Sequence, residues 1–399
     1  MLGHLISMFF IICQGCAQPP VTIFSNEIRP GAWSTEAYVP LLANKKVGVI
    51  VNQTSLIGAT HLLDSLLAKG VNVVKIYDPE HGLRGQADAG EVIKDGFDGK
   101  TGIPVISLYG DKKKPQAGDL SGVDILVFDI QDVGVRFYTY ISTLHYVMEA
   151  AGENNIPLVV LDRPNPNGHY IDGPLLDTVK YRSFVGMHPV PVVYGMTMGE
   201  LARMIKGENW IKSGCNLTVI SCTNYDHSKS YDLPVKPSPN LPNLRAVVLS
   251  PGLCFFEGTP VSIGRGTATP FQLAGHPEYP DKSFSFIPKA VPGAMYPPQE
   301  GKFCYGIDLT HADVDSLFNA SQMDLTVLLD FYNKLPKESF FNASWFDKLA
   351  GGPSFRESIQ KGMTEAQIRQ SWVRDIEAFK IKRAKYLLYA DSVNCARRQ

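Results

Sequence analysis

The sequence predicts an α/β fold: a Rossmann-like, doubly wound, mostly parallel sheet with a second, smaller α+β domain. Several short runs are apolar at nearly every position, as expected of strands that are covered on both faces. Segments with the apolar spacing of helices lie between these runs, so strands and helices alternate over residues 21–245. Proline and aromatic residues then become frequent, and we expect residues 246–399 to form the smaller domain.

The elements of the first domain follow from this alternation. Strands are predicted at residues 45–52, 71–76, 103–108, 123–130, 156–161 and 217–222. Helices are predicted at residues 60–70, 141–154 and 196–207. Thr197 and Glu200 have the spacing of a capping box, which places the start of the last of these helices.

The sequence of the second domain differs in amino-acid composition. Residues 231–298 carry proline throughout and are predicted to form ordered loops, a class of segment that is often functional. A strand at residues 303–309 and helices at residues 324–335 and 364–389 are predicted to follow. The last helix has an apolar face made of Ile368, Trp372, Ile376 and Phe379.

The composition of the 399 residues is that of a globular protein, with 44% hydrophobic residues. The net charge of −1 gives no sign of nucleic-acid binding or of attraction to an anionic membrane. The first strand–turn lacks the G-x-G-x-x-G pattern, no P-loop is present, and the seven cysteines include no C-x-x-C pair. We therefore expect no nucleotide cofactor, no metal site, and cysteines that are mostly free and buried.

Residues 1–20 are interpreted as a signal peptide. Residues 5–13 form a short apolar run, typical of the hydrophobic region of such a peptide. Gly15-Cys16 resembles the cleavage point of a bacterial lipoprotein, although no Lys or Arg precedes the run. An ordinary secretory signal, or a misplaced start codon, is the alternative. We expect an exported protein, periplasmic or anchored to the membrane through a lipid on Cys16.

A rigid turn is predicted after the second strand, in Asp78-Pro79-Glu80-His81-Gly82-Leu83-Arg84-Gly85. Proline restricts the backbone there, and the two glycines permit angles that other residues avoid. The turn would present Glu80, His81 and Arg84, with Glu91 just downstream, and we place the reacting group here. An ordinary loop ion pair between Glu80 and Arg84 is the alternative.

Polar residues also follow three other predicted strands. Asn52 lies at the end of the first strand and Asp129 at the end of the fourth, with Asp132, Arg136 and Tyr138 just after it, and Asp162 and Arg163 follow the fifth. Ligands bind at the carboxyl ends of parallel strands, so these side chains should share one edge of the sheet. Each aspartate could instead cap a helix or form a turn, and Tyr138 could belong to the core.

A further charged pair, Glu257 and Arg265, lies in the loop-rich region. Arg265 stands between two glycines and could approach a ligand closely, or it could form a structural ion pair with Glu257. Two neighbouring carboxyl groups suit glycoside hydrolysis, because one can hold a proton while the other stays ionised. Arginines suit a substrate that carries a carboxylate. A metal-dependent hydrolase that uses His81, Asp129 and Asp132 is a weaker alternative.

Four motifs, in order along the chain, resemble those of the NamZ-type exo-β-N-acetylmuramidases. They are the turn motif given above, Asp129-Ile130-Gln131-Asp132-Val133-Gly134-Val135-Arg136-Phe137-Tyr138-Thr139-Tyr140, Asp162-Arg163-Pro164-Asn165-Pro166 and Phe256-Glu257-Gly258-Thr259. The resemblance covers about residues 25–390. It implies an active site in the cleft between a Rossmann-like domain and a smaller domain. It also implies release of N-acetylmuramic acid (MurNAc) from the non-reducing end of peptidoglycan fragments, without metal or nucleotide.

The resemblance makes Glu80 the best candidate for the catalytic acid, with His81 and Arg84 setting its charge or positioning the sugar. Its partner stays open between Glu91, Asp132, Asp162 and Glu257, and Asp132 and Glu257 join Glu80 as catalytic candidates. The other polar residues named after the strands and in the loops are predicted to bind the substrate, a saccharide such as MurNAc linked to N-acetylglucosamine (GlcNAc). A lipoprotein that binds the cell wall without catalysis is the alternative function.

Overall fold

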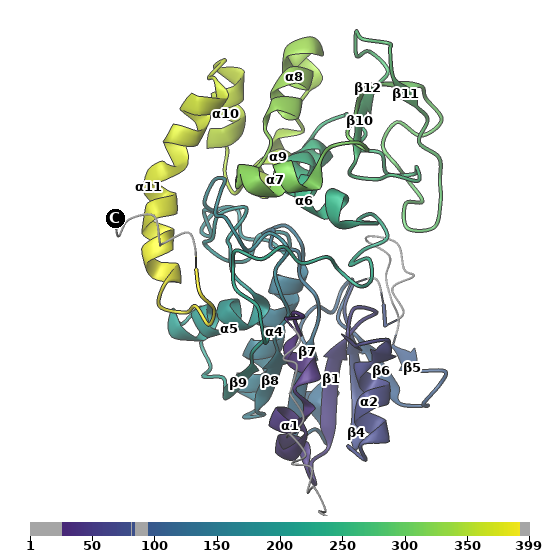
Figure 1. Cartoon of the computed structure of the whole chain (residues 1–399), viewed down its shortest axis with the longest axis vertical. Coiled ribbons are helices and arrows are strands. Elements are labelled where there is room, and N and C mark those ends of the chain that lie inside the picture. The colour runs from purple at the N-terminus through teal and green to yellow at the C-terminus, as the bar shows by residue number, and fades with distance from the viewer. Residues whose placement is uncertain (1–25, 81, 84–94, 392–399) are drawn as a thin grey trace, which may run out of the picture.

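The computed structural model describes residues 26–80, 82–83 and 95–391. The described part consists of a sheet domain, in the lower half of Figure 1, and a mixed domain above it. The carboxyl ends of the central strands point toward the upper domain (Figure 1).

The first domain is built on a seven-stranded sheet with the order β5-β6-β4-β1-β7-β8-β9. Its strands are β1 (Val47–Val51), β4 (Val73–Asp78), β5 (Gly96–Phe97), β6 (Pro104–Ser107), β7 (Ile125–Asp129), β8 (Leu158–Leu161) and β9 (Leu217–Ile220). All neighbouring strands pair in parallel except the edge strand β5, which is antiparallel to β6. In chain order the parallel strands run 3-2-1-4-5-6, which is the Rossmann order. The predicted fold class is therefore confirmed.

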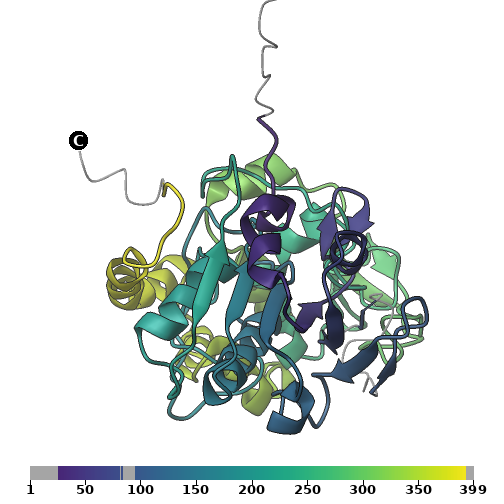
Figure 2. The same cartoon turned by 90° about the horizontal axis from the view of Figure 1, so that it is seen from below.

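Helices cover both faces of this sheet. They are α1 (Thr35–Tyr38), α2 (Leu62–Ala68), α3 (Ala117–Leu120), α4 (Tyr140–Glu153) and α5 (Met198–Gly207). Val49 and Val51 of β1 pack in one cluster with α1 and α2, whereas Ile50 packs in another with α4 and α5. This alternation explains why the central strands are apolar at every position. Seen from below, the strands form a middle layer between helices (Figure 2).

The second domain joins helices to a small antiparallel sheet. Its helices are α6 (Leu244–Leu253), α7 (Val314–Ala320), α8 (Thr326–Lys334), α9 (Ala343–Ala350), α10 (Ser354–Gln360) and α11 (Glu365–Arg383). Its strands are β10 (Leu273–His276), β11 (Ser285–Phe286) and β12 (Cys304–Asp308), in the order β10-β12-β11. A hairpin of β2 (Leu56–Ile57) and β3 (Thr60–His61) and four 3-10 segments, Gly31–Trp33, Val39–Leu42, Cys254–Gly258 and Lys337–Ser339, complete the described elements.

Several predicted elements need correction. Each predicted strand is present within two residues at either end, and the capping box of Thr197 and Glu200 is formed. The predicted helix 364–389 ends at Arg383. Helices α6, α7, α9 and α10 were not predicted. Helix α6 lies in the stretch whose prolines, Pro251 among them, suggested loops. Pro251 has no N–H to donate to the carbonyl of Val247, and that carbonyl instead accepts a hydrogen bond from Ser250 Oγ at 2.8 Å.

The core of the second domain includes residues from the first. Val133, Val135 and Phe137, in the segment between β7 and α4, are buried in one cluster with side chains of α6, α8, α9, α10 and α11. The segment is therefore part of the joint between the domains and fixes how they face each other. Among the described residues, no helix combines the length and the apolar character needed to cross a membrane.

The cysteines of the described part agree with the prediction. Cys215, Cys222 and Cys304 are free and buried, and Cys254 is free and partly buried.

Candidate active site

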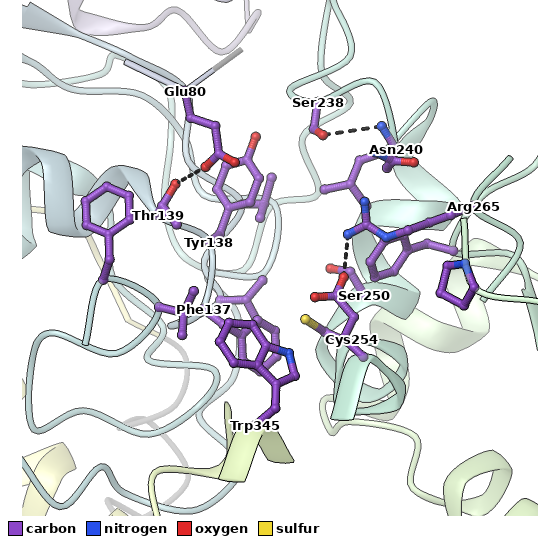
Figure 3. Close-up of a pocket in the computed structure, with 18 of the residues that line it drawn as sticks. Glu80, Phe137, Tyr138, Thr139, Ser238, Asn240, Ser250, Cys254, Arg265 and Trp345 are labelled. Atoms are coloured by element: carbon purple, nitrogen blue, oxygen red, sulfur yellow. Dashed lines mark hydrogen bonds and ion pairs between the residues drawn. The ribbon is translucent and has the colours of Figure 1, made fainter. Parts of the chain in front are cut away.

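A cavity of about 490 Å³ lies between the two domains, a size that suits a small saccharide. The first domain, together with the chain between β9 and α6, contributes Glu80, Tyr109, Val133, Val135, Phe137, Tyr138, Thr139, Phe184, Val185, Ser238, Asn240 and Leu241. The second domain contributes Ser250, Cys254, Glu257, Arg265, Phe271, Tyr296, Pro298 and Trp345. In Figure 3, Glu80 and Arg265 lie on opposite sides of this space, with Phe137 and Trp345 along a third side.

Glu80 reaches the cavity from the predicted turn. Strand β4 ends at Asp78, and the N–H of Gly82 donates to the carbonyl of Pro79 at 3.2 Å, which closes a tight turn around Glu80. Gly82 has a φ of +79°, an angle that glycine adopts without strain. The Glu80 side chain is half-buried and accepts a hydrogen bond from Thr139 Oγ1 at 2.6 Å. Thr139 immediately precedes α4, so the carboxylate lies beside the positive end of that helix.

A second contact supports the backbone of the same turn. Tyr140 donates from its hydroxyl to the carbonyl oxygen of Glu80 at 3.2 Å and accepts from Asn52 Nδ2 at 2.9 Å. Asn52 is itself fixed, because its Oδ1 accepts from the N–H of Thr54 at 2.9 Å. Asn52 is buried and does not line the cavity, so its predicted contact with substrate is corrected to a role in positioning Glu80.

Glu257 and Arg265 form an ion pair on the opposite wall of the cavity. Both side chains keep some solvent exposure, 25% for Glu257 and 21% for Arg265. Arg265 lies in a turn between Gly264 and Gly266, which have φ angles of +76° and +79°, and its guanidinium carbon is 5.2 Å from the centre of the Phe271 ring. The structural alternative is thus realised, but the pair also faces the cavity. The glycines allow the turn that brings the arginine there.

Tyr138, a predicted substrate-binding residue, also lines the cavity. Its hydroxyl donates to the carbonyl of Pro237 at 2.7 Å, and its ring meets the Tyr140 ring edge to face at 4.9 Å. The first contact draws the loop that carries Ser238 and Asn240 to the cavity wall. Asn240 in turn donates from Nδ2 to the carbonyl of Gly293 at 2.8 Å.

Asp132 and Asp162 are buried and do not line the cavity, which corrects the prediction that Asp132 is catalytic and that Asp162 binds substrate or partners Glu80. Asp132 is buried and accepts from the hydroxyl of Tyr194 and, at 2.7 Å, from the N–H of Gly134. Asp162 is buried and accepts from Thr197 Oγ1 at 2.7 Å and from the N–H of Gly199 at 2.7 Å. Burial raises the pKa of both carboxyl groups to about 6. Their hydrogen bonds hold loops together, the role that the capping and turn alternative described.

Asp129, Arg163 and Arg136 are likewise structural, contrary to the prediction that they bind substrate. Arg163 donates to Asp129 through two bonds, from Nε to Oδ1 at 2.6 Å and from Nη2 to Oδ2 at 2.9 Å, and both side chains are almost fully buried. Together with Asn52 and its neighbours, this pair fills the carboxyl edge of the sheet where β1 and β7 meet, the place where Rossmann folds bind ligands.

Arg136 is also fully buried and ties the two domains together. It donates from Nη1 to the carbonyls of Pro174 and Val190, both at 2.7 Å, and from Nη2 to the carbonyl of Leu349 in α9 at 2.8 Å.

His81, Arg84 and Glu91 lie outside the described residues, and their predicted roles stay predictions. Among the residues that the structure describes, no cluster of three or more His, Cys, Asp or Glu side chains could hold a metal ion.

Sequence reasoning missed most of the cavity wall. Thr139 lies within a motif that was singled out, but its hydroxyl gave no separate signal. Tyr296 and Trp345 come from a loop and a helix of the second domain, Asn240 comes from the chain between β9 and α6, and only the folded chain brings them to the cavity that holds Glu80. The frequent prolines of residues 231–298 did point to a region that contributes several residues of the cavity wall.

Comparisons with known proteins agree with the resemblance. The family model of the exo-β-N-acetylmuramidase NamZ N-terminal domain matches residues 47–245, and that of the C-terminal domain matches residues 248–389. The peptidoglycan β-N-acetylmuramidase NamZ of Bacillus subtilis is 39% identical over 373 residues, which are 88% of this chain and 89% of that protein.

Two solved structures of DUF1343 family proteins from Bacteroides fragilis also match. One has a TM-score of 0.85 at 45% identity and covers 92% of this chain and 100% of its own. The other has a TM-score of 0.78 at 28% identity and covers 91% of this chain and 99% of its own.

Proposed function

Because the chain belongs to the exo-β-N-acetylmuramidase NamZ family, we propose that it is a glycoside hydrolase that releases MurNAc from the non-reducing end of peptidoglycan fragments. The observation that carries the proposal in the structure is the cavity in which Glu80 and Glu257 stand with Arg265. Glycoside hydrolysis needs two carboxyl groups beside the bond that breaks. Of the candidate partners within the described residues, Glu257 lines this cavity, whereas Asp132 and Asp162 do not.

We assign the role of proton donor to Glu80. A general acid must reach the glycosidic oxygen, and Glu80 projects from a fixed turn into the space where a sugar would lie (Figure 3). Glu257 accepts a hydrogen bond from Arg265, and this ion pair holds its carboxylate at the cavity wall. In a glycoside hydrolase, a carboxylate in this position stabilises the positive charge that develops on the sugar, attacks the sugar as a nucleophile, or activates a water molecule.

Arg265 has a further use in binding MurNAc. Among the described residues, it is the only Lys or Arg side chain that lines the cavity. MurNAc carries a carboxylate on its lactyl group, and a guanidinium group binds carboxylates through paired hydrogen bonds. The guanidinium already donates to Glu257 through Nη2, and its planar fork has further donors for a second carboxylate.

The direct test is incubation of the protein with the disaccharide MurNAc-GlcNAc, with detection of the products by mass spectrometry. The proposal expects free MurNAc and free GlcNAc in equal amounts. A GlcNAc-MurNAc disaccharide, which has the other sugar at the non-reducing end, serves as the matched control and should stay intact. Binding of MurNAc-GlcNAc without any release of free sugar over long incubation would refute the proposal.

We also propose, from the apolar run at residues 5–13 and the Gly15-Cys16 pair, that the protein is exported and anchored through a lipid on Cys16. These residues lie outside the described part. Detergent phase partition of the wild type and of Cys16→Ala from the same host tests this. The wild type should enter the detergent phase and the variant the aqueous phase, whereas equal partition would count against the anchor.

A further inference from the structure

Tyr296 is an aromatic side chain with an unusual position. It lines the cavity, yet 92% of it is exposed, so it must lie at the mouth of the cavity. Single exposed apolar side chains are ordinary on protein surfaces. Within the described residues, however, the other exposed aromatic side chains, Phe97 and Phe303, do not line this cavity. The location of Tyr296, more than its exposure, calls for an explanation.

The loop that carries Tyr296 is firmly held. Val291 and Ala294 exchange two backbone hydrogen bonds, at 3.2 and 2.8 Å. The carbonyl of Gly293 accepts from Asn240, which itself lines the cavity. The N–H of Lys289 donates to the carbonyl of Gly266 at 3.0 Å, so the loop is bound to the turn that presents Arg265.

The chain on the other side of Tyr296 is held as well. Two prolines, Pro297 and Pro298, follow the tyrosine directly and restrict the backbone. Gln299 then donates from Nε2 to the carbonyl of Pro260 at 2.7 Å. The aromatic ring therefore projects from a support that is fixed on both sides, although the ring itself is exposed to solvent.

We infer that Tyr296 is the platform for the leaving-group sugar, the pyranose ring that is joined to MurNAc through the bond that breaks. The inference rests on the proposed function. An enzyme that removes a terminal sugar encloses that sugar, and the rest of the fragment must leave across the mouth of the cavity. A pyranose ring has a face of C–H groups that packs against an aromatic ring, and tyrosine offers this area at a small cost in side-chain entropy. Tyr296 is thus a residue that determines specificity for the second sugar.

Two substrates distinguish binding of the leaving-group sugar from cleavage of the glycosidic bond. MurNAc-GlcNAc offers a leaving-group sugar, whereas the methyl β-glycoside of MurNAc offers none. We would measure kcat/KM for both substrates with the wild type, Tyr296→Ala, Tyr296→Phe and Phe303→Ala. Phe303 is the matched control, because it is an exposed aromatic residue of the same domain outside the cavity lining. Thermal unfolding of each variant verifies the fold.

The ratio of kcat/KM for the disaccharide to that for the methyl glycoside should fall about tenfold in Tyr296→Ala, mainly through a higher KM for the disaccharide. Tyr296→Phe and Phe303→Ala should keep the wild-type ratio. An unchanged ratio in Tyr296→Ala, with both substrates cleaved by the wild type, overturns the inference and leaves the proposed function intact. A wild type that cleaves neither substrate overturns the proposed function and this inference with it.

Discussion

At the residue scale, Glu80 and its three supports are the centre of the account. Thr139 contacts its carboxylate, Tyr140 contacts its backbone, and Asn52 fixes Tyr140. Asn52 directly follows β1, Thr139 directly precedes α4 and Tyr140 is the first residue of α4, so the supports are anchored to two elements of the sheet domain. A catalytic side chain is effective when its position is set before the substrate arrives.

Replacement of Glu80 by Gln should remove most of the activity and leave the fold unchanged. Gln keeps the size of Glu and can accept the hydrogen bond from Thr139, but it cannot donate a proton to the leaving oxygen. We expect kcat for MurNAc-GlcNAc to fall by about 10²- to 10⁴-fold. Glu278→Gln, an exposed residue outside the cavity lining, is the matched control and should retain full activity. Wild-type turnover by Glu80→Gln would remove this residue from the mechanism.

The buried carboxyl group of Asp78 should make the free energy of unfolding depend on pH. It is 3% exposed at the end of β4, and burial raises the pKa of its carboxyl group to about 7. Between about pH 4 and 7 the unfolded chain therefore loses this proton while the folded chain keeps it, so this group lowers the free energy of unfolding as the pH rises. Asp78→Asn removes the effect.

The stability of Asp78→Asn relative to the wild type should thus increase from pH 4 to pH 7, by about 1.4 kcal/mol for each unit of pKa shift. Urea unfolding of both proteins at several pH values measures the difference. A difference that stays constant over this range would show that Asp78 titrates normally.

At the element scale, the sequence predicted the sheet domain better than the second domain. Strands that are buried on both faces are apolar at each position, and the helices between them have clear spacing and caps, as at Thr197. In the second domain, α6 contains Pro251, and α7, α9 and α10 are short. Helices α6, α9 and α10 bury side chains in the shared core, whereas α7 has no buried residue and is capped at its start by Asp313.

The same scale explains which site residues could be predicted. The motifs and the predicted topology identified Glu80, Tyr138, Glu257 and Arg265 as site residues, and all four line the cavity. The same reasoning could not distinguish polar side chains that face a cavity from those that fill the interior. Asp129 and Arg163 satisfy one another, and Asp132, Asp162 and Arg136 bond to hydroxyl and backbone groups nearby. Such partners come from distant parts of the chain and are visible only after folding.

The contacts of Arg136 give it a structural role, and its replacement tests the joint between the domains. Arg136→Met would leave the carbonyls of Pro174, Val190 and Leu349 without their donor. Each buried group that loses its partner costs about 1–3 kcal/mol, so we expect the free energy of unfolding to fall by at least about 3 kcal/mol. Urea unfolding measures the loss. Arg374→Met, on the exposed face of α11, is the control and should change it little. A small effect at Arg136 with lost activity would restore the substrate-binding prediction.

At the scale of the whole molecule, the active site depends on the contact between the domains. Val133, Val135 and Phe137 leave the sheet domain and enter the core of the second domain, and Arg136 between them bonds to α9. The walls of the cavity that carry Glu80 and Arg265 are thus held at a fixed spacing by buried contacts. Topology alone could predict a cleft, but its shape depends on this shared core.

The isolated first domain should therefore be unstable. A fragment of residues 21–245 would expose Val133, Val135 and Phe137, which are buried in the whole chain. We expect it to bind a hydrophobic dye and to unfold without a sharp thermal transition, while the whole chain gives a cooperative one. Circular dichroism with temperature and dye fluorescence measure this. A fragment with a sharp transition and no dye binding would show that the domains fold independently.

A crystal structure of Glu80→Gln with MurNAc-GlcNAc tests the central claim most directly. The account predicts that the MurNAc ring occupies the cavity, with the glycosidic oxygen beside residue 80, the opposite side of the ring toward Glu257, and the lactyl carboxylate within hydrogen-bond distance of Arg265. A disaccharide bound elsewhere on the protein, or one whose glycosidic oxygen lies out of reach of residue 80, would contradict it.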